Sequence, residues 1–320
     1  MMIDRGDQFF LGVDGGGTKT DAVLTGSDGV VLAKAKAGGL SYRHNSMESV
    51  LEILSGLLET CSSLASIGTD MVTSICIGLP LYGEYESFDA VVSEKIAKRL
   101  GDRVIIVNDA EVAWAGSLSC RPGINVVAGT GMIAFGRDEK GNVGRAGGWS
   151  EHFSDEGSGY WLAVRGMGIF SKQSDGRLPR GPLYRLVKEK YNLCSDYDFI
   201  RVVEEKLLPN REKTAAFQFL IAEAAKMGDM TIPPLYEKAA EELSCAVVAL
   251  KEKLDFFMDP IIASYSGGVF NVGEMILDPL KVNLSRYGIR LEAPIFTPAE
   301  GAAMMASCRL RERNGNERGI

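Results

Sequence analysis

Histidine is nearly absent from this sequence, and cysteine is sparse and scattered. The 320 residues include two histidines and six cysteines, and no two cysteines form a Cys-x-x-Cys pair. Zinc and iron–sulfur sites usually take their ligands at such short spacings, so the pattern predicts no site of that kind. Two histidines are also too few to indicate a histidine metal cluster or a Ser-His triad. The unpaired cysteines favour a reduced, cytoplasmic protein.

Long apolar runs and an excess of positive charge are also missing. No apolar stretch reaches the roughly 20 residues that span a membrane. Charged residues, among them Asp4 and Arg5, precede the first apolar segment, so a signal peptide is not expected. The formal net charge is −7, which argues against nucleic acid because binding to a phosphate backbone requires a basic surface. We therefore expect neither a membrane nor a nucleic acid partner.

The sequence does contain a mixed α/β pattern that runs twice. Three strands with glycine-rich tips are expected first, followed by alternating helices and strands. Later in the chain the order of strand, glycine tip, strand and turn begins again, and a long helical region follows it. With about 100–200 residues per domain, this pattern predicts two domains, which we place at 1–115 and 116–298.

The strongest chemical pattern is a glycine-rich hairpin tip between the first two predicted strands. Its residues are Asp14, Gly15, Gly16, Gly17, Thr18, Lys19 and Thr20. Three consecutive glycines leave backbone N–H groups unshielded, so a phosphate can approach closely. The hydroxyls of Thr18 and Thr20 can donate hydrogen bonds, and Asp14 can bind Mg²⁺ directly or through water. The motif is neither a Walker nor a dinucleotide-binding loop, because a strand follows it instead of a helix.

A second glycine tip, Gly129-Thr130-Gly131, occupies the same place in the second cycle. Many hairpins have such tips, so its significance lies in this recurrence. We expect it to form a second phosphate-binding loop.

Asp109 follows a predicted strand and begins a predicted helix. Its carboxylate can either cap that helix or act as a base at the carboxyl edge of the sheet, where ligands of α/β proteins bind. Phosphoryl transfer requires a group that accepts the proton of the attacking hydroxyl. The two glycine tips therefore favour the base.

A sugar-binding pattern lies farther along the chain. Sugars are typically held by carboxylates that bridge neighbouring hydroxyls and by an aromatic face, and Trp149 with Asp155 fits that pairing. Both residues also have a structural interpretation, in which Trp149 belongs to the core and Asp155 caps the following helix. Trp161 has apolar neighbours and is predicted to be a core residue. The turn 266–268 can either let an adenine approach bare backbone or simply begin a helix.

These motifs, in this order, resemble those of N-acetylglucosamine kinases in the BadF/BadG/BcrA/BcrD ATPase group of the actin/hexokinase/Hsp70-like superfamily. The matching segments span nearly the whole chain and are 14–20, 108–109, 129–131, 147–149, 155–161, 266–269 and 300–303. The resemblance implies a two-domain actin-like ATPase fold of the duplicated ribonuclease H type, with an interdomain cleft. It also implies that a C-terminal helix, at about 299–313, returns to the first domain, and that the protein forms a homodimer.

The same resemblance implies an ATP-dependent sugar kinase that uses Mg²⁺ and phosphorylates an amino sugar, with the 6-hydroxyl as the expected acceptor. Asp109 would accept the proton of that hydroxyl, and Asp14 would bind the metal. The residues expected to bind the nucleotide are Gly15, Gly16, Gly17, Thr18, Lys19, Thr20, Gly129, Thr130, Gly131, Gly228, Ser266, Gly267 and Gly268. The residues expected to bind the sugar are Arg43, His44, Asp109, Gly148, Trp149 and Asp155.

The chain departs from animal N-acetylglucosamine kinases on the sugar side. Met132-Ile133 stands where those kinases have a Ser-Asn pair, and Arg43 stands where they present an asparagine. An arginine would suit an anionic or lactyl-bearing sugar. N-acetylmuramic acid is therefore a candidate substrate besides N-acetylglucosamine.

Two other functions are compatible with the same superfamily. An ATPase activator of a 2-hydroxyacyl-CoA dehydratase or benzoyl-CoA reductase would hold a [4Fe–4S] cluster through cysteines beside glycine-rich turns, yet no cysteine lies near 129–131 in the sequence. A non-catalytic sugar sensor would need no base at Asp109. The sequence favours the sugar kinase over both.

Overall fold

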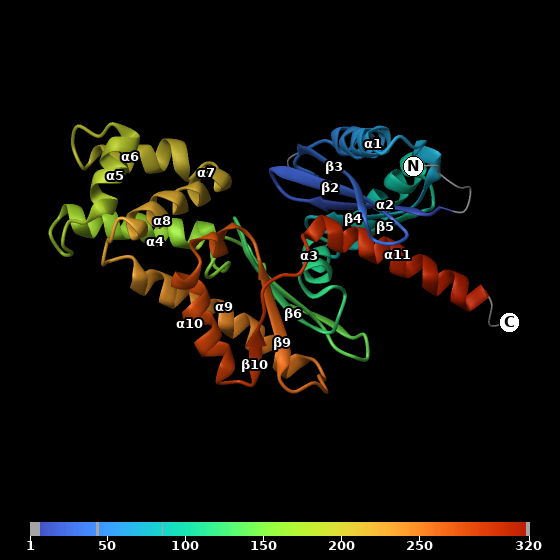
Figure 1. Cartoon of the computed structure of the whole chain (residues 1–320). Coiled ribbons are helices and arrows are strands. Elements are labelled where there is room, and N and C mark those ends of the chain that lie inside the picture. The colour runs from blue at the N-terminus through green and yellow to red at the C-terminus, as the bar shows by residue number, and fades with distance from the viewer. Residues whose placement is uncertain (1–6, 43–44, 85, 318–320) are drawn as a thin grey trace. The chain divides into compact units, whose positions relative to one another are not determined.

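The computed structural model describes residues 7–42, 45–84 and 86–317, with the backbone alone at residue 86 and from 311 to 317. The chain forms two compact units (Figure 1). Unit 1 contains the chain up to Arg121 and from Pro294 onward, and unit 2 is Pro122–Ala293. Within the described ranges, no helix combines the length and the apolar character that a membrane span requires.

Unit 1 is built on a five-stranded sheet with the order β3-β2-β1-β4-β5. The strands are β1 (Phe9–Gly15), β2 (Lys19–Gly26), β3 (Val31–Gly38), β4 (Val72–Leu79) and β5 (Val104–Asn108). The first three strands pair antiparallel, whereas β4 runs parallel to β1 and β5 runs parallel to β4. The carboxyl ends of β1, β4 and β5 therefore meet at one edge of the sheet, which is where α/β folds bind ligands.

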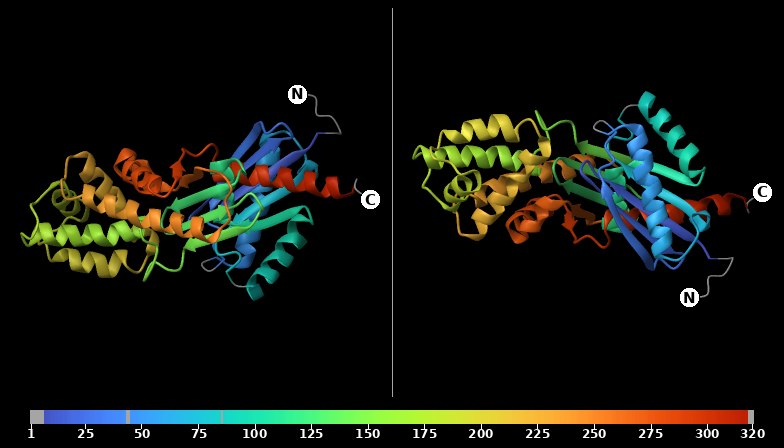
Figure 2. Two further views of the ribbon diagram at one scale, coloured as in Figure 1. Left: turned by 90° about the horizontal axis from the view of Figure 1, so that it is seen from below. Right: turned by 90° about the horizontal axis from the view of Figure 1, so that it is seen from above.

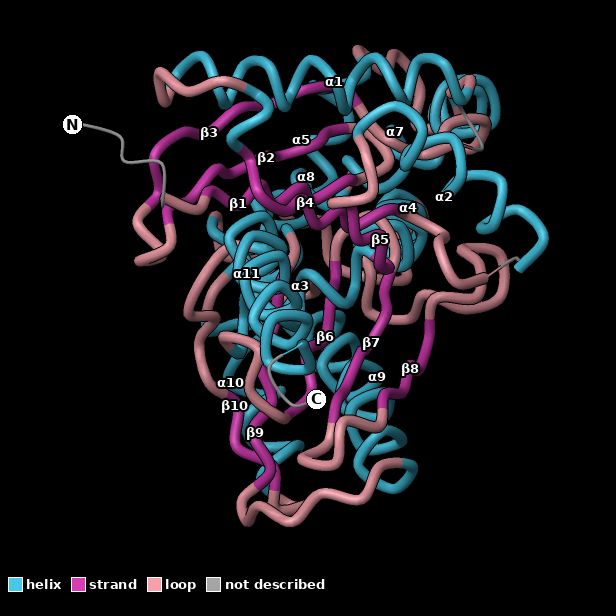
Figure 3. Tube along the Cα trace, turned by 90° about the vertical axis from the view of Figure 1, so that its right-hand side faces the viewer, coloured by secondary structure: helices cyan, strands magenta, loops and turns pink. Residues whose placement is uncertain are grey.

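Helices cover both faces of this sheet (Figures 2 and 3). They are α1 (Met47–Leu64), α2 (Glu86–Leu100), α3 (Asp109–Leu118) and α11 (Pro298–Glu317), with a 3₁₀ turn at Thr69–Met71. Successive side chains of a strand point to opposite faces, so neighbours in β4 enter different cores. Ile75 packs with the apolar faces of α1 and α2, whereas Cys76 packs with Val112 of α3 and Ala302 of α11. Cys76 is thus a small core residue.

Glycines allow α11 to lie directly against β1 and α3. A β-carbon at Gly12 would lie 2.2 Å from the carbonyl oxygen of Ala299, and one at Gly301 would lie 2.1 Å from the backbone nitrogen of Gly116. Non-bonded atoms do not approach this closely, so any larger residue would push the helix away from its neighbours.

We expect Gly301→Ala to lower the free energy of unfolding by about 1–3 kcal/mol, because the added methyl group overpacks the contact with α3. This loss should appear although alanine by itself favours a helix over glycine by about 1 kcal/mol. Gly56→Ala is the matched control, since Gly56 lies inside α1 and its β-carbon would meet no described atom within 4 Å beyond its own turn of helix. Urea unfolding of the two variants measures the difference, and equal stabilities would contradict the prediction.

Unit 2 contains a second five-stranded sheet, with the order β10-β9-β6-β7-β8. The strands are β6 (Gly123–Ala128), β7 (Met132–Arg137), β8 (Val143–Gly147), β9 (Ile261–Ser266) and β10 (Ile289–Leu291). The strands β6, β7 and β8 pair antiparallel, and β9 and β10 run parallel to β6. This order repeats that of unit 1, with β6 in the place of β1. The predicted recurrence of the α/β pattern is therefore confirmed.

The chain between β8 and β9 is helical. Its elements are α4 (Gly159–Ser174), α5 (Pro182–Tyr191), α6 (Asp198–Val202), a π-helical turn (Val203–Leu207), α7 (Arg211–Ala216), α8 (Gln218–Lys226) and α9 (Pro233–Lys253). After β9 follow a 3₁₀ turn (Gly268–Val272) and α10 (Glu274–Ser285). One continuous core joins these helices, apart from α7, to the sheet, and Trp161 is buried in it as predicted.

Candidate active site

Two carboxylates meet at the carboxyl edge of the sheet in unit 1. Asp14 near the end of β1 lies opposite Gly78 of β4, and Asp109 begins α3 directly after β5. A β-carbon at Gly78 would lie 3.3 Å from the Cα atom of Asp109 and 2.4 Å from the side chain of Val112. Glycine at this position therefore lets α3 start close to the sheet, which brings Asp109 near Asp14.

The environment of Asp14 is strongly acidic. Burial, followed by the charges of Asp109 and Asp21, raises the pKa of Asp14 to about 7, although Lys19 acts in the opposite direction. Asp21 has two cationic partners, since Lys19 and Lys36 lie 3.5 and 3.3 Å from its carboxylate. The charge of Asp109 therefore acts on the Asp14 carboxylate, in addition to the effect of burial.

Asn108, not Asp109, caps the helix that Asp109 begins. The side-chain oxygen of Asn108 accepts a hydrogen bond from the backbone of Ala110 at 3.0 Å, and its Nδ2 donates to the carbonyl of Tyr82 at 2.8 Å. The helix-cap interpretation of Asp109 is therefore wrong, and Asn108 has the structural role. The sequence did contain the signal, because asparagine is a preferred cap residue.

The segment that follows β3 packs against the backbone of the first glycine loop. The backbone of Leu40 donates to the carbonyl of Gly16 at 3.0 Å, and a β-carbon at Gly39 would lie 2.0 Å from the carbonyl oxygen of Gly17. Gly17, Thr18 and Lys19 at the tip are exposed. The backbone at the tip is therefore both fixed and accessible.

Thr20 differs from the prediction that its hydroxyl is a donor to phosphate. The residue is fully buried, and its Oγ1 donates to the carbonyl of Gly38 at 2.7 Å. This bond ties β2 to β3, because the two residues are near neighbours across the antiparallel pair. In the structure, Thr20 supports the loop from within the sheet, and Thr18 is the exposed hydroxyl.

The second glycine tip, in unit 2, has all three of its carbonyl groups engaged. The amides of Gly159 and Tyr160, at the start of α4, donate to Gly129 and Thr130 at 2.8 and 3.2 Å, and Gly129 donates to Gly131 at 2.9 Å. The carbonyls of Gly129 and Thr130 therefore point toward the start of α4, whereas the carbonyl of Gly131 closes the tip on itself. An anion can approach from the opposite side without meeting them.

The turn after β9 lies beside this tip. A β-carbon at Gly267 would lie 2.3 Å from the carbonyl oxygen of Ala128 and 3.0 Å from the backbone nitrogen of Gly129, and Gly267 has a φ of +105°. Only glycine satisfies both conditions without strain. Ser266 is held by Asn125, whose Nδ2 lies 3.0 Å from its hydroxyl. The structure thus brings two predicted nucleotide segments of unit 2 together.

Asp155 is buried and paired. It is 2% exposed, and its Oδ2 accepts a hydrogen bond from Nη2 of Arg211 at 2.6 Å. The helix cap of α4 is Ser158, whose Oγ accepts from the amide of Trp161 at 3.1 Å, so the cap interpretation of Asp155 is wrong. Burial raises the pKa of Asp155, and Arg211 opposes that rise.

Trp149 is 75% exposed, so the interpretation of Trp149 as a core residue is wrong as well. Gly147 and Gly148, which precede it, have φ values of +75° and +71°, a conformation that glycine adopts without strain. His152 in the same loop is exposed. An indole at this position is accessible to a ligand, whereas Trp161 is not.

A comparison with protein families decides the family of the chain. The BadF/BadG/BcrA/BcrD ATPase family matches residues 11–306. The chain belongs to this family. Both glycine tips, Asp109 and the turn 266–268 lie inside the matched region.

Known proteins of similar sequence include sugar kinases. The N-acetylmuramic acid/N-acetylglucosamine kinase of Clostridium acetobutylicum is 29% identical over 305 residues, which cover 93% of this chain and 98% of that protein. The N-acetyl-D-glucosamine kinase of Dictyostelium discoideum is 28% identical over 315 residues, with the same coverage of 93% and 98%. The similarity therefore extends over both units.

Solved structures give the same relationship at the level of the fold. A Chromobacterium violaceum protein, provisionally assigned as an N-acetylglucosamine kinase, superposes with a TM-score of 0.75 at 26% identity over 93% of this chain and 98% of its own. A glucokinase of the ROK family from Streptomyces griseus, 17% identical, superposes with a TM-score of 0.58 over 95% and 99% of the two chains. This BadF/BadG/BcrA/BcrD ATPase family member has the α/β fold of actin-like ATPases.

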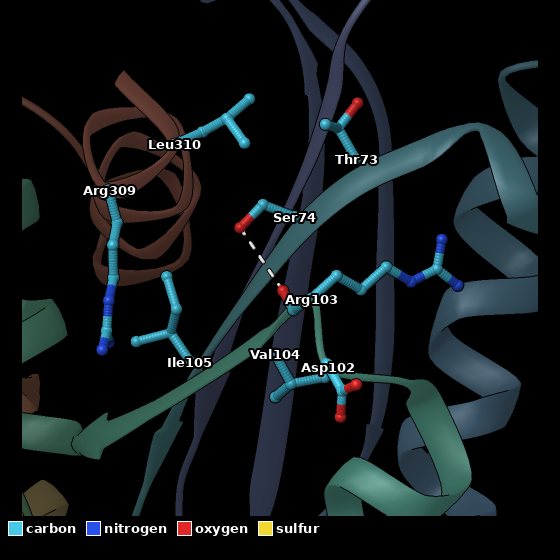
Figure 4. A pocket seen from close by; sticks show the side chains of 8 residues that line it. All are labelled: Thr73, Ser74, Asp102, Arg103, Val104, Ile105, Arg309 and Leu310. Atoms are coloured by element: carbon cyan, nitrogen blue, oxygen red, sulfur yellow. Dashed lines mark hydrogen bonds between the residues drawn. The ribbon is translucent and has the colours of Figure 1, made fainter. Parts of the chain in front are cut away.

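A cavity of about 310 Å³ in unit 1 lies at the other end of the sheet (Figure 4). It is lined by the first residues of β4 and β5 and by Arg309 and Leu310 of α11. The hydroxyl of Ser74 donates to the carbonyl of Arg103 inside it, at 3.4 Å. The cavity is separated from Asp14 and Asp109 by the length of the strands and does not belong to the candidate site.

Three predicted residues remain apart from these clusters. Arg43 and His44 lie outside the described residues. Gly228 follows α8 with a φ of +83°, and the next residue, Asp229, is buried and accepts hydrogen bonds from Gln173, Thr231 and the amide of Leu183. That network fixes the turn that contains Gly228.

Proposed function

We propose that this protein is an ATP-dependent kinase that transfers the γ-phosphate to a hydroxyl, the 6-hydroxyl in our proposal, of an amino sugar such as N-acetylglucosamine or N-acetylmuramic acid. The observation that carries the proposal is the pair of carboxylates, Asp14 and Asp109, beside a fixed glycine loop in a protein of this family. Phosphoryl transfer requires a metal ligand, a proton acceptor and donors to the phosphates, and these residues supply all three.

Asp14 is the proposed ligand of Mg²⁺, directly or through water. The raised pKa of Asp14, caused by burial and then by the charge of Asp109, supports this proposal, because a cation beside Asp14 would favour its ionised form. Among the described residues no cluster of three or more acidic, histidine or cysteine side chains could hold a metal. Mg²⁺ in phosphoryl-transfer sites typically takes one or two carboxylates and completes its shell with phosphate oxygens and water. When bound, it would neutralise charge on the phosphates.

Asp109 is the proposed base. The N-cap position of α3 is filled by Asn108, so the carboxylate of Asp109 is not the cap of this helix. It lies at the carboxyl edge of the sheet next to Asp14, where the acceptor hydroxyl would meet the phosphate. Its role is to accept the proton of that hydroxyl as the new P–O bond forms.

Backbone N–H groups bind the phosphates in this proposal. The first loop contributes the exposed tip Gly17-Thr18-Lys19, supported by Gly15 and Gly16. The second tip, 129–131, contributes backbone groups other than the Gly129 amide, which donates to Gly131, together with the hydroxyl of Thr130. Gly228 and the turn 266–268 are proposed to contact the adenosine. The sugar is proposed to contact Gly148, the exposed indole of Trp149 and the carboxylate of Asp155.

A coupled ADP-release assay tests the proposal directly. The sugars are N-acetylglucosamine, N-acetylmuramic acid, glucosamine, N-acetylmannosamine and glucose, each with ATP and Mg²⁺. Turnover that depends on an amino sugar supports the kinase and identifies its substrate. Slow ATP hydrolysis that no sugar accelerates would contradict it.

The choice between the two acetylated sugars is predicted to depend on Arg43. An arginine at the sugar site would pair with the lactyl carboxylate of N-acetylmuramic acid, which N-acetylglucosamine lacks. Arg43→Ala is expected to reduce the preference for N-acetylmuramic acid about 10-fold, as the ratio of kcat/KM values. Lys36→Ala, which removes an exposed cation of β3, is the control. An unchanged ratio in the Arg43 variant would rule out this role.

A further inference from the structure

Arg211 reaches two acidic side chains of the sugar loop, which we define as residues 147–157. Arg211 is the first residue of α7, in the helical region between β8 and β9. Its Nη2 lies 2.6 Å from Oδ2 of Asp155, and its Nε lies 3.4 Å from Oε2 of Glu151. One guanidinium therefore connects α7 to the segment that contains Trp149.

The same guanidinium also lies against the second glycine tip. A β-carbon at Gly131 would lie 2.5 Å from Nη2 of Arg211 and 2.8 Å from Oδ2 of Asp155. Asp155 additionally accepts a backbone hydrogen bond from Met132, the first residue of β7. The ion pair thus contacts the proposed phosphate tip on one side and the sugar loop on the other.

Asp155 depends on this partner. The carboxylate is almost completely buried, and its backbone has a φ of +60°, a conformation that non-glycine residues adopt only where the surroundings hold them. A buried carboxylate without a cation is costly and takes up a proton instead. The groups of unit 2 that act on it are Arg211, the Met132 amide and the like charge of Glu151. Arg211 is therefore its compensating cation.

We propose that Arg211 is a positioning residue: by pairing with Asp155 and Glu151, it fixes the sugar loop against the second glycine tip in the geometry that binds the sugar. The inference rests on the proposed sugar-kinase function. It assigns to α7 a part in sugar binding that no sequence motif indicates. Arg211 itself contacts neither the sugar nor the phosphates in this proposal.

Kinetics of Arg211→Met provide the first test, with N-acetylglucosamine or N-acetylmuramic acid as the sugar, whichever turns over faster. The KM for the sugar is expected to rise roughly 10- to 100-fold, which corresponds to losing a hydrogen bond between charged groups, while kcat changes less than about 3-fold. Lys213→Met is the matched control, because Lys213 is an exposed cation two residues along the same helix. Arg211→Lys keeps the charge but lacks the planar guanidinium, so its KM for the sugar should lie between those of Arg211→Met and Lys213→Met.

The pH dependence distinguishes positioning from general support of the fold. Removing Arg211 removes the influence that lowers the pKa of Asp155, so that pKa rises further in Arg211→Met. The KM for the sugar in this variant should therefore increase as the pH falls and decrease as the pH rises. The KM of the wild type should change much less. The double variant Arg211→Met/Asp155→Asn should be no weaker than Asp155→Asn alone, because the uncompensated charge is gone.

Hydrogen exchange of the backbone amides tests the inference without any substrate. In Arg211→Met, peptides that cover 129–132 and 147–157 should exchange at least about 5-fold faster than in Lys213→Met. Equal exchange in the two variants would overturn the inference, as would an unchanged sugar KM or fully additive effects in the double variant. If the wild type turned over no sugar, the proposed kinase function would fail, and the exchange result would still decide whether Arg211 holds the two loops.

Discussion

Asp109→Asn is expected to reduce the kcat of sugar phosphorylation by about 100- to 10,000-fold, which is the usual contribution of a general base. Asparagine has the same shape as aspartate, but its amide cannot accept the proton of the attacking hydroxyl. The KM for the sugar should change little, because the side chain can still form hydrogen bonds to the substrate. The coupled ADP-release assay measures both constants.

Asp102→Asn is the matched control for this variant. Asp102 lines the cavity at the opposite end of the same sheet, so the substitution makes the same change of charge away from the proposed site (Figure 4). Its kcat should equal that of the wild type. A variant of Asp109 that turned over sugar and ATP at the wild-type rate would eliminate the proposed base and leave only a positional role for the residue.

Asp14→Asn is expected to lower Mg²⁺-dependent turnover by about 100- to 1,000-fold, through loss of charge stabilisation at the phosphates. The raised pKa of Asp14, about 7, adds a pH signature. Mg²⁺ binds the ionised carboxylate, so its apparent affinity for the wild type should increase as the pH rises through 7, with protons released on binding. Isothermal titration in buffers of different ionisation enthalpy measures this release. The variant should show neither the affinity gain nor the proton release.

Without Mg²⁺, the free energy of unfolding should decrease as the pH rises. Because the folded-state pKa of Asp14 lies above its ordinary value of 3.8, the folded protein binds more protons than the unfolded chain between these values. The contribution of Asp14 to stability is therefore fully present below pH 3.8 and is lost as the pH rises through about 7. In the presence of a chelator, the wild type should lose more Tm than Asp14→Asn between about pH 5 and pH 8.

Asp21→Asn provides the control for the Asp14 experiments. Asp21 also raises the pKa of Asp14, but it forms its own ion pairs with Lys19 and Lys36. This variant should keep Mg²⁺-dependent turnover and shift the pH dependence of Mg²⁺ binding to lower pH. Equal loss of turnover in the Asp14 and Asp21 variants would show that bulk charge, and not a ligand at Asp14, governs the metal.

Patterns within short segments explain why the strands and the glycine tips could be predicted from the sequence. Alternating apolar residues and glycine tips mark hairpins without reference to distant contacts, so β1, β2, β6 and β7 could be predicted from short segments. The strands β8 and β10 were not predicted. β10 has three residues, and β8 has glycine at two of its five positions, so neither has a periodic apolar pattern. Both are strands because a neighbouring strand offers them hydrogen-bond partners.

The assignment of individual side chains depended on contacts that a single segment does not contain. Asp109 and Asp155 could each be read as a helix cap, and the structure gives both caps to neighbours, Asn108 and Ser158. Thr20 carries a donor hydroxyl in the loop motif, yet the adjacent strand uses that hydroxyl. The choice between the two uses of a polar group is decided by which partner lies within about 3 Å.

The sequence by itself determined an α/β fold with a repeated pattern, two glycine-rich hairpin tips and a carboxylate at the edge of a sheet. These features are local, because glycine conformation and strand periodicity act over a few residues. Only the tertiary structure decided that Asp14 and Asp109 share one acidic environment, that Gly267 lies against the second tip, and that Arg211 pairs with Asp155 across 56 residues. Such pairings arise from the packing of distant segments, and desolvation then sets their strength.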